Sequence, residues 1–479
     1  MCRLNAIEGS GEDVASCMDD LLAAYNAYAQ AHPELSGGLR YTRGTPCGTP
    51  FYTGIVREGK PWLSSFATSC GVQPYYPDGR PWLWGQTIAG VRMDFACPEG
   101  WHTYGSGPDG NALDPVCLTS LFPKNAGPGG VCAVGNPVNP ATGNKYQVEV
   151  DYRGGGAAGG LAIERHYNSS GSGARIAIGE NWRLGFDRSL GVDDAALAVN
   201  ARRADGRIHL FRATAEGYGG DPDVNDRLAA LRDVSGTLTA WEYRVADTDE
   251  MERYDPSGRL LSVTSRAGLL WSFEYSDATT PPEVAPGPGL LTRVVAPSGR
   301  SLRLAYDGLG RVASIEDPGG ALHRYAYDAA GNLATVTRPD GALRAYRYEH
   351  PRLLHALTGI VDENGERFAT FGYDDAGRAL LTEHADGAQR HAIAYSPTST
   401  NFATVTDPLG TVRGYEFTQT QRLYRLAKLS QPCAACGQSA QSTVYDARGN
   451  VTARTDFRGV RTTYSWDPAR NLEVSRTEA

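Results

Sequence analysis

The C-terminal half of the sequence repeats itself, and this repeat limits the folds open to the chain. An aromatic residue recurs at Tyr254, Tyr275, Tyr306, Tyr327, Tyr348, Tyr373, Tyr395, Tyr415, Tyr445 and Trp466. The steps between them are 21, 31, 21, 21, 25, 22, 20, 30 and 21 residues, and the two longest contain the insertions DATTPPEVAPGPG and QPCAACGQSA. A fixed period indicates stacked copies of one small structural unit.

We call each recurring aromatic position a rung. Five of these rungs share a Tyr-Asp-x-x-Gly motif. They are Tyr254-Asp255 with Gly258, Tyr306-Asp307 with Gly310, Tyr327-Asp328 with Gly331, Tyr373-Asp374 with Gly377, and Tyr445-Asp446 with Gly449. Asp at the first position and Gly at the fourth are typical of a type I turn, in which the carboxylate accepts a backbone N–H two residues on. The motif therefore predicts structural turns and no chemistry.

A second turn follows about ten residues after each motif, as in DPGG or RPDG, and the segments between turns alternate apolar and polar residues. One unit is therefore two short strands and two turns. Such a hairpin cannot bury its apolar face alone, but units that pair edge to edge form one curling sheet. The expected fold is all-β, a curled sheet or partial hollow barrel. A β-propeller is the alternative, since two units would make one blade, yet the rungs do not alternate between two kinds.

Three segments are expected along the chain. Residues 1–130 form a Cys-rich irregular β module with one helix over 11–31, because apolar residues recur there every three or four positions. Residues 131–250 form a β domain with alternating strands such as KYQVEVDY and LAIERHY, and residues 251–479 hold about ten repeat units. Seven of the nine cysteines precede residue 133, a density typical of disulfides in an oxidising compartment.

The oxidising compartment that the cysteines indicate does not fit the N-terminus of the sequence. The segment MCRLNAIEGSGEDV lacks the basic and apolar regions of a signal peptide. A start site further upstream, export without a cleavable signal, or reduced cysteines in the cytosol would each explain this. The formal net charge of -8, without a Lys/Arg cluster, excludes a dedicated nucleic-acid surface. No apolar run approaches the length of a membrane-spanning helix.

The tempting chemical motifs have simpler interpretations. Gly105–Gly110 fits G-x-G-x-x-G, but its Pro and Asp-Gly indicate a loop. Cys433 and Cys436 lack the further ligands of a zinc site, so a local disulfide that pins the inserted loop is favoured over free thiols. The histidines are scattered. We expect no catalytic, cofactor or metal site. The stripe Tyr325, Tyr327, Tyr346, Tyr348 and Tyr464 is expected to line the core, with sugar stacking as the alternative.

The recurring Tyr-Asp-x-x-Gly motif, with Arg or Asn after the Gly, resembles the YD repeat of Rhs proteins over residues 251–479. The segments NPVNPATGNKYQVEVDY and GENWRLGFDRSL resemble the domain of unknown function that opens many Rhs and polymorphic-toxin proteins. The resemblance implies a hollow β-barrel shell, similar to that of teneurins, which encloses a C-terminal toxin in secreted or cell-surface proteins. Residues 1–130 resemble nothing we can name.

The sequence departs from the family pattern at its end, since it stops at SRTEA inside a repeat without a plug, self-cleavage motif or toxin. The expected function is therefore a structural shell segment, not an enzyme, and a fragment of a larger protein. Its expected partner is a C-terminal effector domain absent from this chain. The rival is a binding module whose exposed repeat aromatics hold a cell-surface glycan or receptor.

Overall fold

A computed structural model describes the strands of residues 1–121 by their backbone, and residues 123–128, 132–155, 160–171, 177–192, 198–433, 440–468 and 470–478. The chain divides into two compact units, Met1–Leu121 and Phe122–Ala479. The expected domain boundaries at residues 130 and 250 stay predictions.

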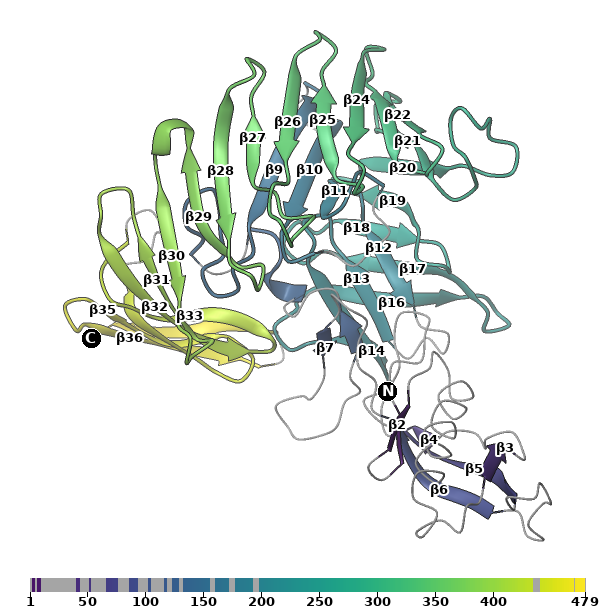
Figure 1. The fold of residues 1–479 in the computed structure, drawn as a ribbon, viewed down its shortest axis with the longest axis horizontal. Coiled ribbons are helices and arrows are strands. Elements are labelled where there is room, and N and C mark those ends of the chain that lie inside the picture. The colour runs from purple at the N-terminus through teal and green to yellow at the C-terminus, as the bar shows by residue number, and fades with distance from the viewer. Residues whose placement is uncertain are drawn as a thin grey trace. The chain divides into compact units, whose positions relative to one another are not determined.

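The first unit contains small antiparallel sheets (Figure 1). One has the strand order β2-β1-β6-β5-β3, with β4 also paired to β5, and the other consists of β7 and β8. Their bounds are β1 (Cys2–Leu4), β2 (Ile7–Gly9), β3 (Arg40–Arg43), β4 (Phe51–Tyr52), β5 (Phe66–Tyr75), β6 (Gln86–Met93), β7 (His102–Tyr104) and β8 (Val116–Leu118). The helix expected over 11–31 and the glycine-rich loop at 105–110 lie outside the described residues.

The second unit is built on one antiparallel sheet of 26 strands, in which each strand pairs with the next one in sequence. The strands are β12 (Ser189–Val192), β13 (Ala198–Arg202), β14 (Ile208–Thr214), β15 (Gly217–Gly220), β16 (Arg227–Arg232), β17 (Leu238–Arg244), β18 (Met251–Tyr254), β19 (Leu260–Thr264), β20 (Leu270–Tyr275), β21 (Leu291–Val295), β22 (Ser301–Tyr306), β23 (Val312–Glu316), β24 (Leu322–Tyr327), β25 (Leu333–Thr337), β26 (Leu343–Arg347), β27 (Gly359–Val361), β28 (Arg367–Tyr373), β29 (Ala379–His384), β30 (His391–Tyr395), β31 (Phe402–Thr406), β32 (Val412–Thr420), β33 (Leu423–Leu429), β34 (Ala440–Tyr445), β35 (Val451–Asp456), β36 (Arg461–Asp467) and β37 (Leu472–Glu478). This continuous order confirms the curled repeat sheet and argues against separate propeller blades.

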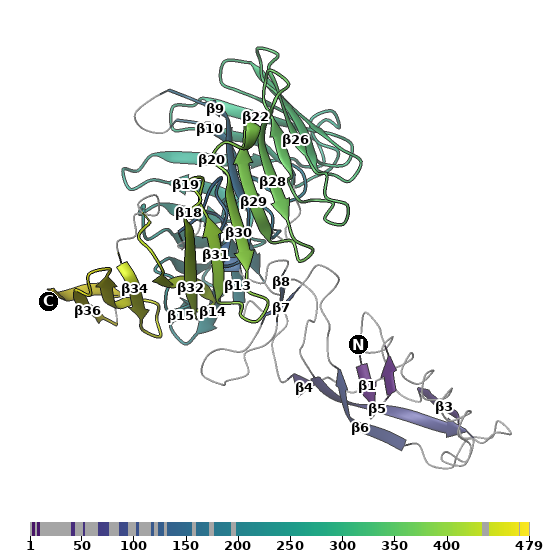
Figure 2. The ribbon, with the colours of Figure 1, turned by 60° about the vertical axis from the view of Figure 1, so that its left-hand side comes forward.

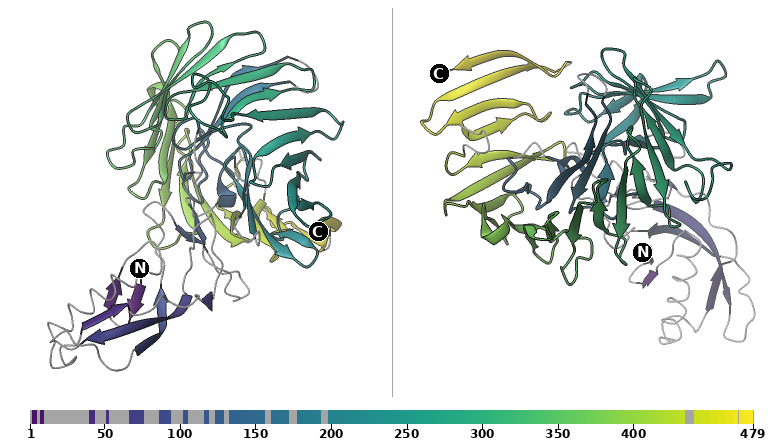
Figure 3. Two further views of the ribbon diagram at one scale, coloured as in Figure 1. Left: turned by 90° about the vertical axis from the view of Figure 1, so that its right-hand side faces the viewer. Right: turned by 90° about the horizontal axis from the view of Figure 1, so that it is seen from above.

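A β-bulge directly before the rung aromatic explains why the sheet curls. The strand register shifts between Ala305 and Tyr306 and between Ala326 and Tyr327, and likewise before Tyr254, Tyr275, Tyr373, Tyr445 and Trp466. A bulge bends its strand and increases the local twist. Because most units carry the same bend, the bends add up to the curl visible in Figures 2 and 3. The sheet stays open, since its edge strands β12 and β37 do not pair with each other.

A second, three-stranded sheet lies inside the curve of the repeats (Figures 1 and 3). Its order is β11-β10-β9, from β9 (Tyr146–Arg153), β10 (Ala162–Asn168) and β11 (Trp182–Leu184). Trp182 of this sheet packs edge-on against Tyr346 of β26, and both side chains are buried. We call the described parts of residues 132–188 the cap layer.

Helical structure among the described residues is limited to two short 3-10 turns, η1 (Pro123–Asn125) and η2 (Ala385–Gly387). In the described part of the chain, no helix is both long and apolar enough to cross a membrane.

Candidate functional site: a capped chamber

The Asp and Gly of each motif build the turn at one end of the rung. In the rung of Tyr306, one carboxylate oxygen of Asp307 accepts the backbone N–H groups of Leu309 and Arg311 at 3.0 and 2.9 Å. Gly310 has a φ of 77°, a left-handed conformation that favours glycine. Asp328, Asp374 and Asp446 accept the corresponding backbone N–H groups in their own turns.

The residue after the Gly connects one rung to the next. The second carboxylate oxygen of Asp307 accepts the Nε–H of Arg311 at 2.8 Å, and this guanidinium lies 4.4 Å from the ring centre of Tyr327. Arg259 lies over Tyr275, and Arg378 over Tyr395, in the same way. The Asp of one rung therefore orients an Arg onto the aromatic ring of the following rung. Our sequence interpretation missed this role, although the recurring Gly-Arg pair was its signal.

The rung tyrosines also bond to the rung before them through their hydroxyls. Tyr306 donates to the Leu291 carbonyl at 2.6 Å and Tyr327 to the Val312 carbonyl at 2.7 Å. Val312 pairs with the strand before it, whereas pairing with the strand after it begins only at Ser314. The hydroxyl thus satisfies a carbonyl that the sheet ladder leaves without a partner. Burial raises the pKa of both tyrosines, so both stay protonated donors.

The aromatic stripe lines the interior of the sheet. Tyr325 and Tyr346 are buried, and the hydroxyl of Tyr348 accepts the Trp182 indole N–H at 2.9 Å. Tyr464, in the last rungs, is half-buried and lies under the Arg476 guanidinium. Sugar stacking needs an accessible ring face, which the buried members do not offer.

The cap layer sits on the turn end of three rungs. The Ala177 carbonyl accepts the N–H of Val312 at 2.6 Å, and the Gly143 carbonyl accepts that of Ala379 at 2.9 Å. Between these rungs, the N–H of Glu180 donates to the Gly331 carbonyl at 3.2 Å. The cap layer therefore covers the Tyr-Asp-x-x-Gly turns of these three rungs.

One buried ion pair fixes the cap layer against the aromatic stripe. Arg165, at 0% exposure, donates to Asp151, at 3%, through two hydrogen bonds of 2.7 Å. Arg165 also donates to the Tyr346 hydroxyl at 2.8 Å, and the Tyr325 hydroxyl donates to Asp151 at 2.9 Å. Burial alone would raise the pKa of Asp151, but the charge and hydrogen bonds of Arg165 hold it below its usual value. No sequence motif marks these residues, because Arg165 and Tyr346 are 181 positions apart.

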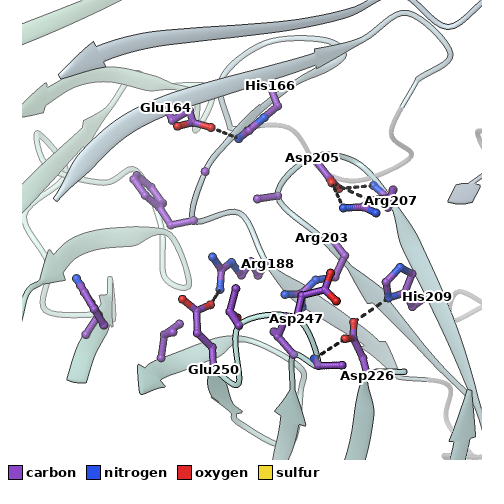
Figure 4. A pocket seen from close by; sticks show the side chains of 18 of the residues that line it. Glu164, His166, Arg188, Arg203, Asp205, Arg207, His209, Asp226, Asp247 and Glu250 are labelled. Atoms are coloured by element: carbon purple, nitrogen blue, oxygen red, sulfur yellow. Dashed lines mark hydrogen bonds and ion pairs between the residues drawn. The ribbon is translucent and has the colours of Figure 1, made fainter. Parts of the chain in front are cut away.

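A cavity of about 660 Å³ lies between the cap layer and the first strands of the large sheet (Figure 4). One side is polar and carries residues of β10, the β13–β14 connection and the loops before β16 and β18. The opposite side is apolar and consists of Val263, Trp271, Phe273, Val294 and Leu302, from four successive strands. The cavity is thus lined jointly by the large sheet and the cap layer.

Several charged groups on the polar side are already paired with carboxylates. Arg188 contacts Glu250 at 3.4 Å and Glu252 at 2.6 Å, and Arg203 contacts Glu252 at 2.7 Å. Burial would raise the pKa of Glu252, yet hydrogen bonding and charge from Arg203 lower it. Paired ions of this kind stabilise a wall, whereas a catalytic group needs a free or activated atom.

The carboxylate of Asp226 is also stabilised in its charged form by its partners. Burial would raise its pKa, but hydrogen bonds from His209 and Tyr243 hold it at about 2. Among the described residues, no group of three or more potential metal ligands occurs.

The predicted Cys433–Cys436 disulfide stays a prediction, because Cys436 lies outside the described residues. Cys433 itself is buried and disulfide-bonded, and the Tyr415 hydroxyl lies 4.0 Å from its sulfur.

Comparisons with family models agree with this geometry. The teneurin YD-shell model matches residues 223–406, and the RHS repeat model matches residues 445–479. A domain of unknown function (DUF6531) matches residues 135–211, which include most of the cap layer. The chain is an Rhs/YD-repeat protein. The Rhs/YD assignment made from the sequence is confirmed, and the role that follows is that of a structural shell.

Searches for individual relatives add less about this Rhs/YD-repeat protein. A search of curated proteins finds no match. Among solved structures, the Photorhabdus luminescens Tc holotoxin pore with a TccC3-D651A mutation is similar at 10% identity and a TM-score of 0.32, over 88% of this chain and 26% of that one. TcdB2-TccC3 without its hypervariable C-terminal region is similar at 10% identity and a TM-score of 0.28, over 86% and 28%. This chain thus spans about a quarter of their length, and likeness this distant carries no argument about function.

Proposed function

We propose that this shell segment is part of a chamber that encloses a C-terminal effector polypeptide and delivers it outside the cell that makes it. The observation that carries the proposal is the combination of one continuous curled sheet with a cap layer that covers turns of its rungs. A curled sheet with covered turns partly surrounds an interior, which a flat repeat array does not.

The interior supports containment rather than catalysis. The charged groups Arg188, Arg203 and Asp226 are paired, and Tyr325, Tyr346 and Tyr348 of its aromatic stripe bond to or pack against the cap layer. Export or display at the cell surface is part of the proposal. It rests on the family resemblance and on the dense cysteines of residues 1–132.

Protection from protease tests the proposal. The chain is expressed in its full natural reading frame, and the C-terminal polypeptide is followed by immunoblot during digestion. We expect that polypeptide to resist digestion at least ten times longer than the same polypeptide expressed alone. Equal digestion rates while the repeats remain intact would contradict containment.

A matched variant ties the protection to the wall. Arg165→Met removes the buried cation of the cap layer and should abolish protection, whereas Arg303→Met, at an exposed pair on the large sheet, should preserve it.

A further inference from the structure

The curl brings two distant parts of the large sheet together along one seam. Asp223, in the loop between β15 and β16, lies 3.3 Å from Arg425 of β33. Asn225 of the same loop accepts a hydrogen bond of 3.1 Å from Asn471, which lies between β36 and β37. No strands pair across this seam in the described ladders, so side chains must hold it.

The short 3-10 turn η1 (Pro123–Asn125) lies across the seam and bonds to both sides. The Lys124 ammonium contacts Asp221 at 2.7 Å and Asp223 at 2.5 Å on the early side. It also donates to the Gln421 carbonyl at 3.0 Å on the late side. One ammonium group therefore joins a loop residue 99 positions further along the chain to a turn residue 297 positions further along.

The neighbouring residue strengthens the late side of this junction. The Asn125 amide donates to the Arg422 carbonyl at 3.1 Å, and its oxygen accepts the backbone N–H of Tyr424 at 3.0 Å. Gln421 and Arg422 form a tight turn with positive φ values of 48° and 65°, and the carbonyls of this turn accept the hydrogen bonds from η1.

The junction is buried, which separates it from an ordinary surface contact. Lys124, Asp221 and Asp223 are each below 10% exposure, and Asn125 is almost fully buried. A buried ammonium is stable only when carboxylates compensate its charge, and losing one partner leaves the others uncompensated. Burial would raise the pKa of Asp221, but the charge of Lys124 lowers it. Release of Lys124 should therefore loosen both sides of the seam at once.

The seam is also a wall of the cavity, because Lys124, Asp223, Val224 and Leu423 belong to the cavity lining. We propose that Pro123–Asn125 is a strap that closes the curl beside the cavity, and that releasing Lys124 opens the chamber at this seam while the repeats stay folded. This inference goes beyond containment, since it concerns how the wall closes. It does not depend on whether the chamber encloses a polypeptide.

Hydrogen exchange followed by mass spectrometry on the full chain tests the strap. Lys124→Met should raise exchange about tenfold or more in two segments together, 221–232 and 415–429. Exchange in β22–β25 should not change. Lys428→Met is the matched control, because this lysine lies in β33 but forms an exposed pair with Glu416. It should leave both segments as in the unaltered chain.

Asn125→Ala gives a second test that leaves the charges in place. It should raise exchange in the same two segments by a smaller factor, and it decides the question if Lys124→Met does not fold. Unchanged exchange, faster exchange on one side only, or a uniform increase over the whole sheet would each overturn the strap.

Discussion

The repeat rungs and the cap layer lie against each other, yet they are held together by opposite means. A rung such as β22–β23 depends on three contacts that recur in rung after rung. The Asp carboxylate accepts backbone N–H groups of its turn, the Arg guanidinium lies on the aromatic ring of the next rung, and the Tyr hydroxyl donates to a carbonyl of the previous rung. The cap layer depends on contacts that occur once, such as Arg165 with Tyr346. Stability is therefore distributed in the repeats and concentrated in the cap.

This difference predicts how each region answers to a single substitution. In the repeats, a change removes one of many equivalent contacts, and neighbouring rungs continue to pair. In the cap layer, no second residue can take over from a buried ion or from a glycine pressed against backbone. Four predictions follow this contrast from the largest effect to the smallest.

Arg165→Met should destabilise the second unit most. The substitution leaves the Asp151 carboxylate buried without its cation, which typically costs about 3–5 kcal/mol. Chemical denaturation followed by tryptophan fluorescence measures the loss. Arg303→Met removes an Arg from an exposed pair with Glu316 on the large sheet and should cost less than about 1 kcal/mol. Equal losses for the two variants would contradict the contrast between the regions.

Two glycines near the contact between the cap layer and one rung allow a closer comparison. Gly143 of the cap layer and Gly377 of the rung below it both have a left-handed φ, of 78° and 80°. A Cβ at Gly143 would lie 2.6 Å from the Arg378 Cα, whereas a Cβ at Gly377 would meet nothing within 4 Å. We expect Gly377→Ala to cost about 1 kcal/mol from backbone strain alone, and Gly143→Ala to cost more than about 2 kcal/mol.

Denaturation midpoints of both variants decide this, with Gly308→Ala as the control. A Cβ at Gly308 also meets nothing within 4 Å, and its φ is not left-handed. Its substitution should leave stability unchanged or raise it by up to about 1 kcal/mol. If Gly143→Ala lowers the free energy of unfolding no more than Gly377→Ala does, the cap layer can shift to accommodate the added Cβ at this contact.

Tyr306→Phe should have a moderate effect, because it removes only the hydroxyl that bonds to the Leu291 carbonyl. The loss should be about 1 kcal/mol in a denaturation experiment. Tyr464→Phe is the matched control from the last rungs, where no hydrogen bond of the hydroxyl is found among the described residues, and it should change stability by less than about 0.5 kcal/mol. An equal effect at both positions would contradict the idea that the hydroxyl bond of Tyr306 stabilises the rung.

The sequence allowed the repeats to be predicted in detail because their contacts are local. The Asp307–Gly310 turn and the strand–turn rhythm follow from residue types a few positions apart. The bulge before most rung aromatics and the stacking of Arg311 on Tyr327 were missed, since they depend on the pairing register between neighbouring units. Arg165, Lys124 and Glu252 were invisible for a stronger reason. Their partners lie tens to hundreds of positions away, and a single sequence does not show which distant residues meet.

The smallest expected effect is a pH dependence confined to the cap layer. His166 of β10 is buried, with its ring nitrogens next to the Tyr146 hydroxyl at 2.6 Å and to Glu164 at 3.2 Å. Burial lowers its pKa below the ordinary 6.5. The unfolded chain therefore takes up this proton first as pH falls, so the stability that neutral His166 contributes is lost progressively below about pH 6.5.

Denaturation at pH 8, 7, 6 and 5 should show this as a difference in slope. From pH 8 to 7, neither the folded nor the unfolded state gains much proton at this site, so the unaltered chain and His166→Gln should change in parallel. Between pH 6.5 and 5, the unaltered chain should lose more stability than His166→Gln, with a total difference below about 1 kcal/mol. Parallel curves over this lower range would mean that His166 does not couple the cap layer to protonation, and that its concentrated contacts are insensitive to mild acid.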